Sequence, residues 1–363
     1  MDRLRPIISP EGLGEGGPPA EPDPEEWRNL CEAALEVKEL APWEWMPDSD
    51  FFAVRDPETN RTLTIGVLGA LGDHLAVAAY PGPAGFASFL NISGLKSPGD
   101  EDWLEIGLLQ DCFSASFEDR NELGARDRDL LKRFGIRCRG RRAWPLFRRH
   151  LPGAVPRFLD PWETRALTHC LRQTAEVAGR LKEDPKSLRP KRGGKILVRV
   201  PRTGKDGLEW SDAWEVPKAE LPKREPPEMP DLHELQRMLE QANRVTEPVE
   251  MDFFPLPTAV RDDAGPYYPW MLLWVLRSQG LILGMSLSRY ETHPQTFLDD
   301  FLAQISAEGF LPLDLRVRRA RIAEWFGPLI EGAGGRIELE DELEVMSNIR
   351  AKMERTGLFG LNL

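Results

Sequence analysis

The chain has few cysteines and histidines, and they do not form the patterns of metal or disulfide sites. Its 363 residues include four cysteines with no C-x-x-C pair, and five histidines. No two histidines stand four positions apart or in an H-E-x-x-H arrangement, so neither a structural nor a catalytic zinc is expected. We therefore expect reduced thiols, no metal and no cofactor.

Long apolar runs are absent as well. No segment approaches the roughly 18 uninterrupted apolar residues of a membrane span, and the first residues have no apolar core of a signal peptide. A G-x-S-x-G elbow is missing, and the glycine-rich segments lack the Lys-Ser/Thr of a phosphate loop. These absences predict a cytoplasmic protein without membrane contact.

Positive charge is in deficit, except in one place. Lys and Arg number 47 against 59 Asp and Glu, and the net charge of -12 argues against a protein that coats nucleic acid. The exception is the basic segment, residues 132–150, which contains no acid. Its candidate phosphate-binding residues are Arg137, Arg139, Arg141, Arg142, Arg148 and Arg149.

Two interpretations of the basic segment remain open. Its arginines could hold phosphates by bidentate hydrogen bonds while Trp144 and Phe147 stack on bases. Alternatively, the segment is a strand whose arginines face acids of the same chain, with Glu118, Asp119 and Asp129 as the expected partners.

Composition divides the chain into four parts. Residues 1–24 are rich in Gly, Pro and Glu and are expected to form a flexible tail. Residues 25–215 are expected to form a domain of α+β character. The segment 216–230 carries five prolines and mixed charge, which indicates a linker. Residues 231–363 then form a second domain.

An aromatic cluster follows the first expected helix, which spans about residues 25–40. Trp43 and Trp45 stand beside Glu44 and Met46, shortly before Phe51. Aromatic side chains of this kind anchor interfaces or line pockets, and they also fill protein cores. Trp43 and Trp45 are therefore candidates for contact with a partner or a ligand, with a core position as the alternative.

The second domain reads as alternating strands and helices of an α/β fold. Apolar runs separated by turn residues predict three strands, and helical periodicity alternates with short strands after them. The predicted order is β-β-β-α-β-α-β-α, over residues 249–256, 271–276, 281–287, 294–307, 313–317, 320–330, 336–339 and 342–355.

This order resembles the RNase H-like core shared by ribonuclease H and the integrase cores of transposases. The hairpin Leu276–Ser288, with the sequence LRSQGLILGMSLS, looks like the integrase segment in which a short turn leads into a strand. The segments Trp43–Met46, Met251–Pro257 and Pro269–Val275 are similar to a bacterial two-domain family of unknown function. That resemblance implies a mixed sheet and a bacterial protein, and it supplies no activity.

Asp252 is the candidate catalytic residue that the resemblance implies. Nuclease chemistry of this group needs carboxylates clustered at the ends of neighbouring strands, where they hold two Mg²⁺ ions. The position where a second aspartate is expected instead reads Arg318-Arg319, and cations there repel Mg²⁺.

The sequence therefore favours the fold without the reaction. We expect a non-catalytic binding or interaction protein of the bacterial cytosol, whose partner is a protein or a nucleic acid. The alternatives are a nucleic-acid-processing enzyme built around Asp252 and a nucleic-acid binder that uses the basic segment.

Overall fold

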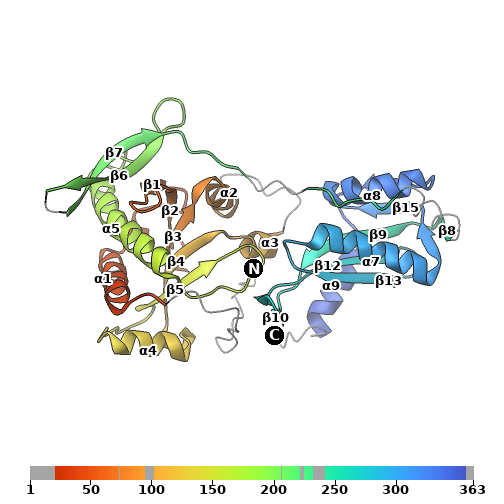
Figure 1. Ribbon diagram of the computed structural model, residues 1–363, viewed down its shortest axis with the longest axis horizontal. Helices are drawn as coiled ribbons and strands as arrows, with labels where there is room; N and C mark the ends of the chain where they lie inside the picture. Colours follow the sequence, from red (N-terminus) through yellow and green to blue (C-terminus); the bar gives the residue numbers. More distant parts are fainter. Residues whose placement is uncertain are drawn as a thin grey trace.

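Two units, each built around one mixed β-sheet, make up the protein (Figure 1). The computed structural model describes residues 21–72, 74–94, 102–205, 207–220, 225–231 and 242–356. A seven-stranded sheet precedes residue 216, and a five-stranded sheet follows residue 242. The α/β class is thus as predicted. Residues 1–20 of the expected tail lie outside the described residues, and so do residues 232–241, most of a helix that the sequence predicts from Asp231 to about Asn243.

The N-terminal unit consists of seven strands, five α-helices and two short 3₁₀ turns among its described residues. These are α1 (Pro24–Leu40), η1 (Pro42–Glu44), β1 (Phe51–Arg55), β2 (Thr62–Leu68), β3 (Ala76–Pro81), α2 (Gly82–Ile92), α3 (Trp103–Leu108), β4 (Cys112–Glu118), η2 (Arg120–Glu122), α4 (Ala125–Arg133), β5 (Trp144–His150), α5 (Pro161–Glu183), β6 (Ile196–Gly204) and β7 (Gly207–Glu215). The sheet order is β5-β4-β3-β2-β1-β6-β7, and only β1 and β6 pair in parallel.

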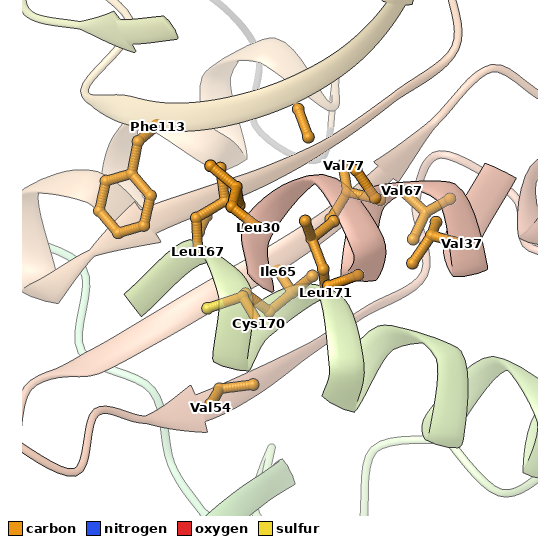
Figure 2. Packing of buried hydrophobic residues seen from close by; sticks show 14 of the residues in the cluster. Leu30, Val37, Val54, Ile65, Val67, Val77, Phe113, Leu167, Cys170 and Leu171 are labelled. Carbon is orange, nitrogen blue, oxygen red and sulfur yellow. The ribbon is translucent and has the colours of Figure 1, made fainter. Parts of the chain in front are cut away.

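Helices α1 and α5 cover one face of this sheet. The start of α1 is fixed by a capping box, in which the Asp23 carboxylate accepts from the backbone of Glu26 while the Glu26 side chain accepts from the backbone of Asp23. Figure 2 shows side chains of α1 and α5, Leu30 and Leu171 among them, converging on Ile65 of β2. Removal of these side chains from water is the main force that holds the layers together.

The C-terminal unit has five main strands and three described helices. Its elements are β8 (Asn243–Val245), β9 (Val249–Pro255), β10 (Val260–Asp262), β11 (Gly265–Tyr267), β12 (Trp270–Leu276), β13 (Leu281–Ser288), α7 (His293–Glu308), β14 (Phe310–Pro312), β15 (Asp314–Val317), α8 (Ala320–Gly332), β16 (Arg336–Leu339) and α9 (Glu344–Thr356). The sheet order is β13-β12-β9-β15-β16, and β12 alone runs in the direction opposite to that of the other four strands.

Helices cover both faces of the five-stranded sheet. Side chains of α7 and α8 pack on one face and those of α9 on the other. As a result, every residue of β9 and of β12 is buried. This burial explains why the two strands read as continuous apolar runs rather than as an alternating pattern.

The two sheets share one plan. In each, three antiparallel strands form a meander, and a later strand pairs in parallel with the first strand of that meander. The shared order is β3-β2-β1-β6 in the N-terminal unit and β13-β12-β9-β15 in the C-terminal unit.

The units are in direct contact. The backbone N–H of Tyr268 donates to the carbonyl of Gly153 at 2.9 Å, and Ala154 forms an isolated bridge with Tyr267. Gly153 has a φ of 73°, and a Cβ there would lie 2.5 Å from the Cβ of Tyr290. Only glycine combines this backbone conformation with so close an approach, so the contact is specified by sequence.

Candidate functional site

The central strand β9 carries two acidic residues on one face of the sheet. Successive side chains of a strand point to opposite faces. Phe254 belongs to the cluster beneath α9, so Asp252 and Glu250 point to that face as well, while Phe253 points towards α7 and α8. Both acids are buried, with 2% exposure for Asp252 and 0% for Glu250.

Two arginines hold the carboxylate of Asp252. Arg318 and Arg319 directly follow β15, the parallel neighbour of β9. The Nε of Arg319 lies 3.0 Å from one oxygen of Asp252, and the Nε of Arg318 lies 3.5 Å from the other. The arginines thus lie beside Asp252, at the position where the resemblance led us to expect a second aspartate. Both oxygens of the Asp252 carboxylate face cations.

The N-terminal unit completes this ionic cluster through the short helix α3. Glu105 is 1% exposed, and its carboxylate lies 2.8 Å from Nη1 of the fully buried Arg319. Arg319 therefore bridges an acid of each unit. Buried charges are tolerated only when they are paired, so Glu105, Arg319 and Asp252, here called the buried triad, depend on one another.

A second ion pair joins α3 to α9. Asp102 caps α3 by accepting from the backbone N–H of Glu105, and it also accepts from Nη2 of Arg350 at 2.9 Å. Burial raises the pKa of Asp102, but the Glu105 N–H and the Arg350 guanidinium lower it more, so its pKa lies below the ordinary value. Asp102 is thus held as a carboxylate.

Beside the buried triad lies a pocket of about 210 Å³ at the junction of the two units. It is lined by Asp102, Asp252, Arg318, Asp341, Glu342, Leu343, Met346, Ser347 and Arg350. The acids of this lining do not converge: among the described residues, no three His, Cys, Asp or Glu side chains are grouped so as to hold one metal ion. The lining of the pocket thus contains both acids and arginines.

Glu250 has a structural role next to this pocket. Its carboxylate accepts from the backbone N–H of Met346 at 2.7 Å, which satisfies a donor in the first turn of α9. Arg277 lies 3.3 Å from Glu250 and also binds Glu340. The hydrogen bond from Arg277 lowers the pKa of Glu340. The charges of Glu250, Arg277 and Glu340, near the N-terminal end of α9, are thus compensated within the chain.

The basic segment is divided between arginines that are at least partly buried and arginines that are exposed. Arg148 binds Asp127 through two hydrogen bonds of 2.8 and 2.7 Å, and Arg149 lies 2.6 Å from Asp111 and 3.1 Å from Glu163. These pairs stabilise β5. The acids in these pairs are therefore not Glu118 and Asp129, which the sequence suggested as partners.

The remaining arginines of the segment lie nearer the surface. Arg137, Arg139 and Arg141 are exposed, and Arg142 is half-buried. Asp119, an expected partner, lies 3.9 Å from Nε of Arg141 and accepts from the backbone N–H of Arg142. Arg137 and Arg139 have no ionic partner within the described part of the chain.

His150, at the end of the basic segment, predicts a loss of stability in acid. Burial, with Arg149, Arg148 and His74 nearby, lowers its pKa from 6.5 to about 4. Between these values the unfolded chain binds the proton and the folded chain does not, so stability falls as the pH falls from 6.5 towards 4. In urea titrations over this range, His150→Gln should lose less stability than the unaltered protein. Identical acid curves would contradict the assignment.

Trp43 and Trp45 do not line the pocket. Trp43 is 7% exposed and packs against Phe117 in the N-terminal core. Trp45 is half-buried, its indole N–H donates to the carbonyl of Ala178 at 3.1 Å, and the ammonium of Lys182 lies over its ring. The structure thus favours the core interpretation of this cluster.

Sequence reasoning missed the contribution of α3. The spacing of Asp102 and Glu105 is that of a helix N-terminus, which is the one local signal for this helix. Their partners Arg350 and Arg319 lie more than 200 positions later. Nothing in the sequence near either acid indicates that it contacts the other unit.

Comparison with known proteins identifies two domains of unknown function in the chain. Residues 27–199 match the model of the domain of unknown function DUF7309, and residues 234–354 match that of the domain of unknown function DUF6930. No curated protein and no solved structure matches the chain. None of the helices described here has the length and apolar character needed to cross a membrane.

Proposed function

We propose that this protein is a non-catalytic interaction protein whose C-terminal unit keeps an RNase H-like scaffold without the metal site of a nuclease. The order β9, β12, β13, α7, β15, α8, β16, α9 supports the scaffold. The observation that carries the proposal is the position of Arg318 and Arg319 at the two oxygens of Asp252.

The residues present do not suit Mg²⁺. This ion requires nearly octahedral oxygen ligands at about 2.1 Å, usually with carboxylates among them. Near a protein surface, two like unit charges 4 Å apart repel by about 4 kcal/mol, and a divalent ion beside one guanidinium by about twice as much. Asp252 has one such group at each oxygen, so its charge is already compensated.

The contact between the units supports the same proposal. Glu105 of α3 pairs with Arg319, which in turn pairs with Asp252. The charge of Asp252 is thus compensated by side chains of the protein itself. Such an arrangement joins the units and keeps the carboxylate of Asp252 paired with cations of the same chain.

A cleavage assay tests this proposal. The protein is incubated with single-stranded and double-stranded DNA, RNA and an RNA–DNA hybrid, with Mg²⁺ or Mn²⁺. No cleavage above that of a mock preparation is expected. Asp252→Asn serves as the site variant and Asp263→Asn, in an exposed turn, as the matched control. Cleavage that disappears in Asp252→Asn and persists in Asp263→Asn would overturn the proposal.

Binding of nucleic acid through the basic segment is a second candidate function. The exposure of Arg137, Arg139 and Arg141 favours it, because side chains that hold phosphates must reach the surface. The competing observation is that Arg148 and Arg149 are engaged inside the unit. Only the exposed part of the segment therefore enters this proposal.

Salt dependence tests the second candidate. If the three exposed arginines hold phosphates, replacing all of them by glutamine should flatten the slope of log K against log salt by roughly 2, measured on single-stranded DNA. A control with the same charge change, Lys186→Gln/Arg189→Gln/Arg192→Gln, alters exposed residues of another loop and should keep the slope. Absence of binding at low salt ends this candidate.

A further inference from the structure

The outer strand β13 of the C-terminal sheet has an apolar and partly exposed face. Ile282 is 40% exposed, Met285 is 50% exposed and Leu287 is 48% exposed. β13 pairs with β12 on one side, and it is the last strand of the sheet on the other. Among the residues that the structure describes, no strand therefore lies beside its outer backbone groups.

These three side chains extend the core beneath α9. Directly opposite residues of an antiparallel pair share a face of the sheet. Ile282, Met285 and Leu287 stand opposite Val275, Leu273 and Met271, in that order, and all three β12 residues are fully buried in the cluster under α9. The apolar surface thus continues from the core beneath α9 onto the edge strand β13, where these side chains become partly exposed.

β13 differs from other outer strands of this protein in its charge. The opposite edge of the same sheet, β16, carries Arg336 and Glu338, and the outer strand β7 carries acids as well. Charges on edge strands prevent pairing with other chains. Residues 278–288 contain no charged residue at all.

The charges that flank β13 are neutralised within the chain. Arg277 binds Glu340, and Arg289 binds Asp262. A second molecule that approaches β13 thus meets neither an unpaired cation nor an acid on the strand. This matters because two copies with a net charge of -12 each repel one another over most of their surface.

We propose that β13 pairs in antiparallel fashion with β13 of a second copy of this chain, so that two five-stranded sheets join into one. The strand is self-complementary for such pairing. A two-fold axis at Ser286 places Met285 of each copy opposite Leu287 of the other, on the face that α9 leaves uncovered. An isologous contact of this kind closes on itself and forms a dimer rather than a fibre.

The mass of the full chain in solution tests the dimer. Light scattering after gel filtration should give twice the chain mass, and Met285→Lys should give the single mass with the circular dichroism spectrum of the unaltered, folded protein. Leu339→Lys is the matched control, since Leu339 is a 60% exposed leucine on the opposite edge strand β16, and it should remain dimeric. A single mass for the unaltered protein, or an unaffected dimer in Met285→Lys, would overturn the proposal.

Hydrogen exchange of the unaltered protein provides a second reading that requires no variant. Amides of β13 should become more protected as the protein concentration rises through the dissociation constant, while those of β16 should not change. Protection of β13 that is independent of concentration would mean that another segment of the same chain covers the strand, and it would contradict the dimer.

Discussion

Arg319→Met is expected to lower the free energy of unfolding by about 3–5 kcal/mol, because it leaves the buried Glu105 without its cation and the buried Asp252 with Arg318 alone. Arg319 is 0% exposed and Glu105 is 1% exposed, so water cannot replace the lost pairing. Urea denaturation followed by tryptophan fluorescence measures the change. Arg189→Met, at an exposed position, is the control and should change stability by less than about 0.5 kcal/mol.

The triple variant Glu105→Gln/Asp252→Asn/Arg319→Met separates charge from shape. Its side chains are uncharged and similar in size, so most of the loss seen in Arg319→Met should return. Glu105→Gln alone should weaken the C-terminal unit even though Glu105 belongs to the N-terminal unit. A loss below about 1 kcal/mol in Arg319→Met, or a triple variant no more stable than the single one, would contradict the buried triad.

Trp274→Ala is the second large effect, with an expected cost of about 3–5 kcal/mol. Trp274 lies in the middle of β12, is 1% exposed and meets the ring of Phe301 at a centroid distance of 5.3 Å. Its removal opens a cavity between the sheet and α7 that a rigid strand cannot close.

The same denaturation assay measures the effect of Trp274→Ala. Leu339→Ala is the matched control, because it removes an apolar side chain that is 60% exposed and should cost less than about 0.5 kcal/mol. Equal losses of stability in the two variants would show that Trp274 of β12 does not lie in the core of this unit.

The strands and helices of the C-terminal unit could be predicted because their signals are local. The turn Ser278-Gln279-Gly280 separates two apolar runs, and Gly280 has the positive φ of 63° that this turn requires. Prediction placed the strands at 271–276 and 281–287, and they are Trp270–Leu276 and Leu281–Ser288. The helix expected at 294–307 is His293–Glu308, ended by Gly309 at a φ of 68°.

The short elements could not be predicted in this way. β10 and β11 have three residues each, and α3 has six, so their conformation depends on contacts rather than on periodicity. α3 buries Glu105 and Ile106. Its position is fixed by ion pairs to residues of the other unit, and a single sequence does not encode such long-range contacts in a readable form.

The candidate site was predicted in part. The absence of an aspartate after β15 and the presence of Arg318 and Arg319 followed from the order of elements, and both arginines lie at Asp252. The partner Glu105 was not foreseen. In the basic segment, alternation along β5 could have shown that Arg149 lies on the same face as the buried Phe147, and hence that it points inward.

Binding of Mn²⁺ is the most direct test of the central proposal that Arg318 and Arg319, and no metal ion, compensate the charge of Asp252. Electron paramagnetic resonance of free Mn²⁺ measures the bound fraction in the unaltered protein and in Asp252→Asn, with Asp263→Asn as the surface control. Equal binding of Mn²⁺ by all three proteins is predicted, since Arg318 and Arg319 are paired with the carboxylate of Asp252. One or two ions bound tightly to the unaltered protein and to Asp263→Asn, and lost in Asp252→Asn, would contradict the claim.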